Sequence, residues 1–430
     1  MLRLRILTLG CSKNTVDSER IAYLLGSRYN VVPEGECDVL LINTCGFIGD
    51  AKEESVNAIL EAVEARKAGE ISKLVVFGCL SQRYRSELEK EIPEVDAYYG
   101  TNDYDDLLAY LGIRGEFDKS VSRLLSEAGN YAYLKISEGC NRNCAYCAIP
   151  GIRGRHRSRT IESLVEETKL LAAKGVRELN VIAQDITYYG LDIYHKRALA
   201  ELIRALSEVD GIEWIRLHYS YPAAFPDNVL KEIAQNPKVC KYMDIPLQHI
   251  NDDVLTLMRR GSTGEQIRSL ISKFRTMVPG IVLRTTLIVG HPGETRKAFN
   301  ELIAFVKEAG IQRLGAFTYS EEEGTYGARH YADTISEKTK SRRLDALMEV
   351  QKEVSLDFNL SRVGSIEKVI VDGISGEFLV CRSQWESPGV DGEIFVRMEG
   401  VEDPYSLVGG FIEVRVTSAD EYDLYAEKLN

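Results

Sequence analysis

Short apolar runs alternate with amphipathic segments through the first part of the chain. The apolar runs are LRILTLG, DVLLINTC and KLVVFGC, and helical periodicity occupies residues 17–27 and 52–68 between them. Short strands that alternate with helices are typical of parallel βα units, because parallel neighbours need a crossover connection. The pattern predicts an α/β fold with a doubly wound parallel sheet at the N-terminus.

The same alternation resumes at Tyr131 and continues through the middle of the chain. Amphipathic segments such as residues 162–173 and 198–207 separate six apolar runs, which are YLKIS, ELNVIA, IEWIRL, KYMDI, VLRTTLIV and LGAFTY. Six βα units predict a parallel barrel, and since a closed barrel of this kind has eight, we expect a partial (β/α)6 barrel. A charged helical stretch over residues 337–358 trails it.

From Gly364 the pattern changes to alternating apolar and polar residues. The strings IEKVIVDG, GEIFVRM and FIEVRVTSA lie between turns that carry Gly or Pro, which predicts a small antiparallel β-barrel. We expect a linker near residues 111–130, which include RGEFDKS. The predicted domains therefore cover residues 1–125, 130–358 and 364–430, in line with a length of 430 residues.

Composition is that of an ordinary globular protein. Apolar residues make up 44% and charged residues 27%, which excludes an intrinsically disordered chain. No apolar run approaches the roughly 18 to 20 residues that cross a bilayer, and MLRLRILTLG predicts a strand rather than a signal peptide. The cysteines number nine, an odd count without a secretory signal, so we expect reduced thiols in a cytoplasmic protein without a membrane partner.

Net charge excludes a general nucleic-acid binder. Acidic residues outnumber basic ones by 65 to 53, whereas such a binder needs positive faces that displace counterions. Residues 364–430 hold 14 Asp and Glu against 5 Lys and Arg, so they carry -9 of the net -12. This surplus favours a basic partner through electrostatic steering, although an acidic face that only maintains solubility would give the same count.

Three N-terminal cysteines follow the ends of successive predicted strands. Cys11, Cys45 and Cys79 each lie beside a glycine, and the carboxyl ends of parallel strands meet at one rim of a sheet. A single buried cysteine usually behaves as a small apolar residue. We favour a shared ligand role because three thiols recur at the same end, each beside a residue that allows close backbone approach.

A second cysteine triplet follows the first predicted barrel strand. Cys140, Cys144 and Cys147 form a C-x3-C-x2-C pattern within EGCNRNCAYCAIP. Three thiolates on one loop can hold three corners of a cubane iron-sulfur cluster and leave one iron open. A structural zinc site would need a fourth ligand nearby, and a thioredoxin-like pair would start a helix of another fold.

The triplet, with Tyr146 before its last cysteine, resembles the radical S-adenosylmethionine (radical-SAM) enzymes, and the chain as a whole resembles the methylthiotransferases, which combine an iron-sulfur sheet domain, a radical-SAM barrel and a TRAM barrel. The branch that modifies ribosomal protein twelve of the small subunit is similar in LGCSKNTVDSE, NTCGFIGDAKEES, EGCNRNCAYCAIPGIRGRHRSR, PLQHI, MRRG, RTTLIVG and YSEEEGT. The tRNA-modifying branch usually carries Gln-Met-Asn where this chain has Ser12, Lys13 and Asn14. His291 stands where relatives often carry Phe.

The resemblance implies a radical reaction that puts a methylthio group on the β-carbon of an aspartate. An unactivated C–H bond is beyond acid-base catalysis at neutral pH. The resemblance implies that an electron from a 4Fe-4S cluster at Cys140, Cys144 and Cys147 cleaves S-adenosylmethionine (SAM). The resulting 5'-deoxyadenosyl radical then takes the hydrogen atom. A second 4Fe-4S cluster at Cys11, Cys45 and Cys79 would carry the sulfur, and a donor such as flavodoxin or ferredoxin would supply electrons.

Further residues are expected to contact the cofactor. Gln184 and Asp185 follow the second barrel strand, at the face where catalytic groups collect. Leu287, Ile288 and Gly290 resemble the adenine-contact segment of the superfamily, and Tyr146 lies within the triplet. The four arginines of the following run either contact the cofactor or substrate or are solvated; they are Arg153, Arg155, Arg157 and Arg159.

Two other functions remain open from the sequence. The same methylthiolation on a tRNA adenosine is supported by the RNA-associated TRAM fold and opposed by the acidity of residues 364–430, so we expect no tRNA partner. A non-catalytic iron-sulfur carrier or scaffold would explain both triplets but not the barrel. Cys37, Cys240 and Cys381 have no partner at ligand spacing and are expected to pack or lie on the surface, and no role is expected for the six histidines.

Overall fold

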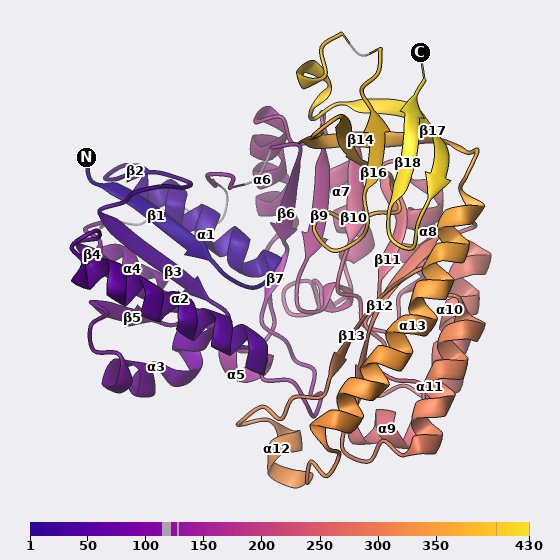
Figure 1. Cartoon of the computed structure of the whole chain (residues 1–430), viewed down its shortest axis with the longest axis horizontal. Helices are drawn as coiled ribbons and strands as arrows, with labels where there is room; N and C mark the ends of the chain where they lie inside the picture. The colour runs from indigo at the N-terminus through magenta and orange to yellow at the C-terminus, as the bar shows by residue number, and fades with distance from the viewer. Residues whose placement is uncertain (114–121, 127–128, 401, 430) are drawn as a thin grey trace.

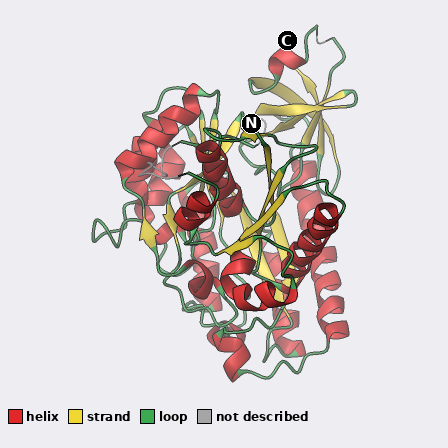
Figure 2. Ribbon diagram, turned by 90° about the vertical axis from the view of Figure 1, so that its left-hand side faces the viewer, coloured by secondary structure: helices red, strands yellow, loops and turns green. Residues whose placement is uncertain are grey.

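The computed structural model describes residues 1–113, 122–126, 129–400 and 402–429. Two parallel sheets lie side by side, and a small barrel stands at one end of the molecule (Figure 1, Figure 2). The RGEFDKS string of the predicted linker lies outside the described residues. Among the described residues, none of the helices has the length and apolar character needed to cross a membrane.

The N-terminal sheet has five strands in the order β2-β1-β3-β4-β5, and all its pairings are parallel. Its strands are β1 (Arg3–Thr8), β2 (Asn30–Val31), β3 (Val39–Thr44), β4 (Lys73–Gly78) and β5 (Ala97–Tyr99). The helices are α1 (Ser12–Leu25), α2 (Gly49–Lys67), α3 (Cys79–Glu91) and α4 (Tyr104–Tyr110). Apolar clusters cover both faces of the sheet, which is why β3 is buried at every position. The predicted doubly wound sheet is confirmed.

The central sheet has six parallel strands in the order β13-β12-β11-β10-β9-β6. Its strands are β6 (Tyr131–Lys135), β9 (Glu178–Ile182), β10 (Trp214–Leu217), β11 (Val239–Asp244), β12 (Val282–Val289) and β13 (Arg313–Thr318). The helices outside it are α6 (Ile161–Ala173), α7 (Leu199–Ser207), α8 (Asp227–Gln235), α9 (Asp252–Leu257), α10 (Gly264–Met277), α11 (Arg296–Ala309) and α13 (Glu337–Ser361). Because β6 and β13 form its two edges, the predicted partial barrel is confirmed.

Short elements surround the mouth of this barrel. They are β7 (Ser137–Glu138), β8 (Arg157–Ser158), α5 (Ile149–Arg153), the 3-10 helix η1 (Ile186–Tyr188) and α12 (Tyr326–His330). On the N-terminal side, α1 contacts β6 and α3 packs on α5, so the two parallel domains meet beside the barrel mouth (Figure 1).

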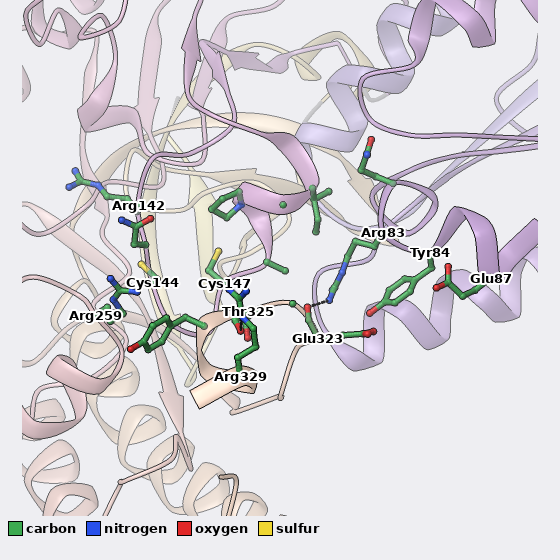
Figure 3. A pocket seen from close by; sticks show the side chains of 18 residues that line it. Arg83, Tyr84, Glu87, Arg142, Cys144, Cys147, Arg259, Glu323, Thr325 and Arg329 are labelled. Atoms are coloured by element: carbon green, nitrogen blue, oxygen red, sulfur yellow. Dashed lines mark hydrogen bonds between the residues drawn. The ribbon is translucent and has the colours of Figure 1, made fainter. Parts of the chain in front are cut away.

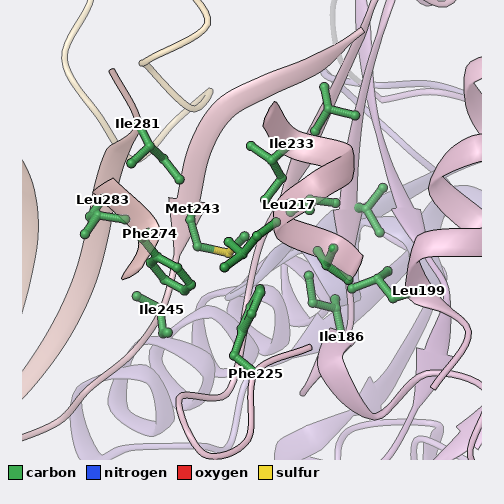
Figure 4. Packing of buried hydrophobic residues seen from close by; sticks show 14 of the residues in the cluster. Ile186, Leu199, Leu217, Phe225, Ile233, Met243, Ile245, Phe274, Ile281 and Leu283 are labelled. Atoms are coloured by element: carbon green, nitrogen blue, oxygen red, sulfur yellow. The ribbon is translucent and has the colours of Figure 1, made fainter. Parts of the chain in front are cut away.

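A continuous apolar core lies between the six strands and their helices. Met243 of β11 and Leu217 of β10 lie in one cluster with Phe274 of α10 (Figure 4), and Phe225 meets Phe274 edge to face at 5.0 Å. Helix α10 begins with a capping box between Thr263 and Gln266. This packing fixes the strands whose carboxyl ends hold the predicted site.

The C-terminal strands close into a barrel in the order β14-β15-β16-β18-β17. The strands are β14 (Ile366–Ser375), β15 (Phe378–Arg382), β16 (Ile394–Arg397), β17 (Phe411–Ala419) and β18 (Leu424–Lys428), with the 3-10 helix η2 (Tyr405–Leu407) between them. The predicted barrel is confirmed, but β16 and β18 pair in parallel whereas the other pairings are antiparallel. A closed ring of five strands cannot alternate direction throughout, so at least one pair must be parallel.

A loop of the small barrel enters the six-stranded barrel and reaches β11 and the residue that follows β10. The hydroxyl of Tyr242 donates to Asp391 at 2.7 Å, and Ser387 lies 3.1 Å from the ring of His218. Beside this loop, Glu178 of β9 bonds Arg216 and Arg382 at 2.7 and 2.8 Å. The two barrels are therefore joined through a buried ionic and hydrogen-bonded interface.

Candidate functional site

The N-terminal cysteines meet at the carboxyl rim of their sheet. Cys11 caps α1 after β1, Cys45 directly follows β3, and Cys79 begins α3 after β4. Burial raises the pKa of the Cys79 thiol to about 12; the positive charge of Arg153 opposes this rise, and the nearby thiols of Cys11 and Cys45 add to it. This mutual influence shows that the three cysteines lie close together in the fold, although 34 residues separate each one from the next along the chain.

Gly10 allows the close approach of this trio. Its φ is +90°, a conformation that favours glycine, and a Cβ atom there would lie 2.9 Å from Cys45 Sγ and 2.7 Å from Cys45 Cβ. Any larger residue would push Cys45 out of the rim. Close packing against Cys45 therefore explains why a glycine lies next to the first cysteine, as the sequence pattern of a glycine beside each cysteine suggested.

The second triplet lies on the loop between β7 and α5. Burial raises the pKa of Cys140 to about 11 and that of Cys147 to about 12, and Cys144 adds to both shifts. The loop is fixed by the Ala145 amide, which donates to Met258 O at 3.0 Å, and by the Gly327 amide, which donates to Ala145 O at 2.7 Å. The three partly buried thiols thus share one loop that backbone hydrogen bonds hold in place.

The donor chemistry of both trios fits an iron-sulfur cluster. Thiols with raised pKa values become thiolates when a cation replaces the proton, and thiolates are the preferred ligands of such clusters. Within the described residues, no group of three His, Cys, Asp or Glu side chains is spaced to hold a metal ion. A four-iron cluster separates its thiolates more widely than a single ion does, so this spacing does not conflict with a cluster.

Arg153 lies between the N-terminal trio and Glu138, which just precedes the triplet loop. Its guanidinium Nη2 lies 3.6 Å from Cys79 Sγ and donates to Asn14 Oδ1 at 2.6 Å. Its Nη1 donates to Asp17 and to Glu138, both at 3.0 Å. Burial alone would lower the pKa of Arg153, but these carboxylates hold it well above its ordinary value. The cation is therefore fixed between the N-terminal rim and the triplet loop.

Arg260 lies on the other side of the triplet. Its Nη1 is 3.3 Å from Cys144 Sγ and 3.4 Å from the hydroxyl of Tyr146. The guanidinium carbon lies 4.3 Å from the centroid of the Tyr221 ring, and that of Arg142 lies 3.8 Å from the same centroid. Arg260 belongs to the MRRG string but was not predicted as a site residue, because a buried arginine has no periodic pattern.

The other predicted site residues lie around the same mouth. Gln184 Nε2 donates to Glu138 Oε1 at 3.2 Å, and its own Oε1 has no hydrogen-bond partner among the described residues. Asp185 accepts from Arg142 Nε at 2.8 Å and from the Thr187 amide at 2.9 Å, so it orients the triplet loop.

The predicted adenine segment lies at the end of β12. Leu287 is fully buried and pairs with Gln248, and Ile288 packs against the neighbouring apolar cluster with Tyr146. Gly290 has a φ of +77°, and its amide donates to Glu294 at 2.7 Å. The backbone thus bends sharply where the strand meets the barrel mouth.

A cavity of about 510 Å³ reaches the triplet from the junction of the two parallel domains (Figure 3). Cys144 and Cys147 border it on one side, and Arg83 and Tyr84 of α3 border it on the other. Arg83 also binds Glu322 at 2.9 Å across the junction. The N-terminal domain therefore contributes part of the wall around the triplet loop.

The four arginines that follow the triplet differ in how far they are buried. Arg153 is buried at the junction, and Arg159 forms an ion pair with the buried Glu167. Arg155 and Arg157 are exposed, and both border a second cavity beside Arg153. The remaining cysteines lie in apolar cores, as predicted; they are Cys37, Cys240 and Cys381.

Comparisons with known families cover most of the chain. Residues 134–306 match the radical SAM superfamily, residues 3–100 match "Uncharacterized protein family UPF0004", and residues 363–428 match the TRAM domain. The radical SAM domain implies S-adenosylmethionine and one 4Fe-4S cluster as cofactors.

Solved structures share the fold. The radical S-adenosylmethionine methyltransferase TsrM from Kitasatospora setae has a TM-score of 0.53 at 16% identity, over 74% of this chain and 75% of that one. The cobalamin-dependent S-adenosylmethionine radical enzyme OxsB has a TM-score of 0.53 at 12% identity, over 83% of this chain and 62% of that one.

Relatives similar along their whole length are more informative. Ribosomal protein uS12 methylthiotransferase RimO from Bacteroides thetaiotaomicron is 50% identical over all of this chain and 98% of its own length. The protein of the same name from Christiangramia forsetii is 48% identical over all of this chain and 94% of its own length. The chain therefore belongs to the radical SAM methylthiotransferase family whose members include these uS12 enzymes.

Proposed function

We propose that this enzyme adds a methylthio group to the β-carbon of an aspartate in ribosomal protein uS12, and that it does so in the cytoplasm. The observation that carries the proposal is the contact of Arg153 with Cys79, which brings the N-terminal rim against the triplet loop. The names of the full-length relatives support the choice of substrate. A reaction that joins carbon to sulfur needs both reacting centres in one space.

Each trio of cysteines would hold one 4Fe-4S cluster. Cys140, Cys144 and Cys147 would hold the cluster that works with SAM, and Cys11, Cys45 and Cys79 would hold a second one. When bound, these groups supply the electron, the hydrogen-abstracting radical and the sulfur that acid-base side chains cannot supply.

The protein's own side chains would orient the cofactor and keep water out. Arg260 and Tyr146 cover Cys144, and Asp185 fixes Arg142 beside the triplet. Gln184 offers an unpaired carbonyl oxygen to a polar group of SAM. The end of β12 offers an apolar edge for the adenine ring through Leu287, Ile288 and Gly290.

The acidic small barrel would attract the basic ribosomal protein, and a donor such as flavodoxin or ferredoxin would supply electrons. Some acidic residues of the small barrel are buried in ion pairs and do not add to its surface charge. Glu386 pairs with Arg313 and Arg362, and Asp391 pairs with Arg284. The surplus that remains on the surface still disfavours RNA phosphates. For that reason we propose uS12 rather than tRNA.

Mass spectrometry of reaction products tests the substrate. The enzyme, reconstituted without oxygen and supplied with reductant and SAM, is incubated with uS12 and with total tRNA. We expect the mass of a methylthio group in place of hydrogen on one aspartate of uS12. A mark found on tRNA alone would contradict the proposal.

Metal analysis tests the second cluster and the carrier alternative. We expect iron and acid-labile sulfide for two clusters in the wild-type protein and for one cluster in Cys45→Ala, with Cys37→Ala as the matched control. An electron carrier would leave SAM intact under reducing conditions. Detection of 5'-deoxyadenosine would therefore exclude the carrier function.

A further inference from the structure

Lys13 carries a buried positive charge at the junction of the two parallel domains. The residue is 6% exposed, and the ring of Tyr219 lies over its ammonium group, with 2.9 Å between Nζ and the ring centroid. The other two buried lysines of the described chain, Lys135 and Lys340, each contact two carboxylates. No carboxylate of the described residues lies within 4.0 Å of the Lys13 ammonium, which is the limit for an ion pair.

A buried ammonium group without an anion is costly, because the charge loses its hydration. A tyrosine ring offsets only part of this cost. Proteins seldom bury lysine unless it is paired. The fold therefore maintains this charge in a state that an incoming anion would stabilise.

Tyr219 is held in a strained conformation where it meets Lys13. Its φ is +61°, which is unfavourable for a residue with a bulky side chain. Two contacts maintain this backbone: the Tyr219 amide donates to Asp244 at 2.9 Å, and its carbonyl accepts from the Ile186 amide at 3.2 Å. The strained residue directly follows the end of β10 and His218, at the mouth of the barrel.

The surroundings of Lys13 also favour an anion. Lys13 is the second residue of α1, so it lies at the positive end of the helix dipole, and the first turn contains no acidic residue. Ser12 Oγ is buried and has no hydrogen-bond partner among the described residues. Cys11, which belongs to the N-terminal trio, immediately precedes these two residues.

We propose that Lys13 binds the carboxylate of a reactant in the space between the two cysteine trios. The inference rests on the proposed function, because that reaction supplies the anions. Two of its reactants carry a carboxylate, namely the target aspartate of uS12 and the methionine moiety of SAM. Lys13 would orient the reactant that it binds, and the bound carboxylate would serve as its counterion.

Binding measurements on charge variants test this proposal. Lys13→Met and Lys13→Gln remove the charge and keep an unbranched chain, whereas Lys13→Arg keeps the charge. Lys73→Met is the matched control, since Lys73 Nζ lies 4.7 Å from the centroid of the Tyr110 ring at the amino end of β4. Each reconstituted protein is titrated with SAM, with uS12, and with uS12 in which the target Asp is replaced by Asn.

We expect the two neutral variants to bind one carboxylate ligand at least about 30-fold more weakly, which is the effect of removing one partner of a buried charge pair. Lys13→Arg should restore most of the affinity, and Lys73→Met should bind as the wild type does. If the neutral variants bind uS12 more weakly, and if replacing the target Asp by Asn weakens their binding no further, then the target aspartate is the ligand of Lys13. Weaker binding of SAM identifies the methionine carboxylate.

Thermal unfolding without ligands gives a second readout that separates binding from packing. Removing an unpaired buried charge should leave the melting temperature unchanged or raise it. Unchanged affinity of the neutral variants for both SAM and uS12 would overturn the inference, whatever the melting temperature. Failure of the proposed function is seen separately, as a wild-type enzyme that leaves uS12 unmodified.

Discussion

Arg153 Nη2 lies 3.6 Å from Cys79 Sγ, although 74 residues separate them along the chain. Arg153 ends the helix that follows the triplet loop, and Cys79 begins the helix that follows β4. Their contact joins the helix after the triplet loop to the N-terminal trio. One buried guanidinium thus contacts the N-terminal trio and Glu138, which lies just before the triplet loop.

Replacing Arg153 with Met should destabilise the junction between the domains. The change leaves the buried Asp17 and the partly buried Glu138 with less positive charge, which costs about 3–5 kcal/mol of unfolding free energy. Chemical denaturation measures the loss. Asp17→Asn in the same chain should recover part of it, because the uncompensated carboxylate is then gone. Equal stability of Arg153→Met and wild type would show that the ion pairs contribute nothing.

Replacing Arg260 with Gln should make the cluster proposed at the triplet harder to reduce. The cation lies 3.3 Å from Cys144 Sγ, and a nearby positive charge stabilises the more negative, reduced state. The midpoint potential should therefore shift to a more negative value, as followed by electron paramagnetic resonance during a redox titration. Arg268→Gln, far from the triplet in an exposed ion pair with Glu308, should leave the potential unchanged.

His291 should make the protein sensitive to mild acid. Burial lowers its pKa from 6.5 to about 4, although its bond to Pro292 O opposes the shift. His291 binds a proton more tightly in the unfolded chain than in the folded protein. The neutral side chain therefore stabilises the folded state fully above pH 6.5, and this stabilisation is lost as pH falls toward 4. The loss is about 3 kcal/mol, at 1.36 kcal/mol for each pH unit.

The variant His291→Phe should show a flatter dependence of unfolding free energy on pH between 6.5 and 4. Phe has a similar shape and takes no proton. His195→Gln, an exposed position, serves as the control and should keep the wild-type slope. A wild-type slope in His291→Phe would mean that other groups cause the acid sensitivity.

Replacing Asp391 with Ala should weaken the contact between the two barrels. Its side chain is 2% exposed, accepts from the Tyr242 hydroxyl at 2.7 Å and lies 3.5 Å from Arg284. Leaving both partners buried without it should cost about 3 kcal/mol, measured by chemical denaturation. Asp391→Asn should cost less because the amide oxygen can still accept from Tyr242. An equal loss in both variants would contradict this account.

Much of the fold follows from local patterns in the sequence. The strands predicted in both parallel sheets and in the small barrel are present, because apolar runs and their turns are local signals. The predicted helices at 17–27 and 52–68 begin earlier, at Ser12 and Gly49, since the first turn of a helix next to a ligand loop is not amphipathic. Strands β15 and β18 were not predicted, because they are short and lie close to turns.

The site was less predictable than the fold. The cysteines are recognisable because both their spacing and their positions after strands are visible in the sequence. Arg153 was noted only as one member of an arginine run, and Lys13 only as a branch difference, since burial and pairing depend on contacts between distant segments. Residues that act through such contacts can be identified only in the folded structure, where the domains lie together.

The loop around Asp391 has a consequence for how a ribosomal protein would be reached. Because this loop is inserted in the floor of the six-stranded barrel, the acidic end domain cannot swing freely as a tethered arm. A protein bound to that domain must reach across a fixed distance to the mouth at the opposite end of the six-stranded barrel. Substrates that present their target on an extended finger would meet this requirement, whereas a compact globule with a recessed target would not.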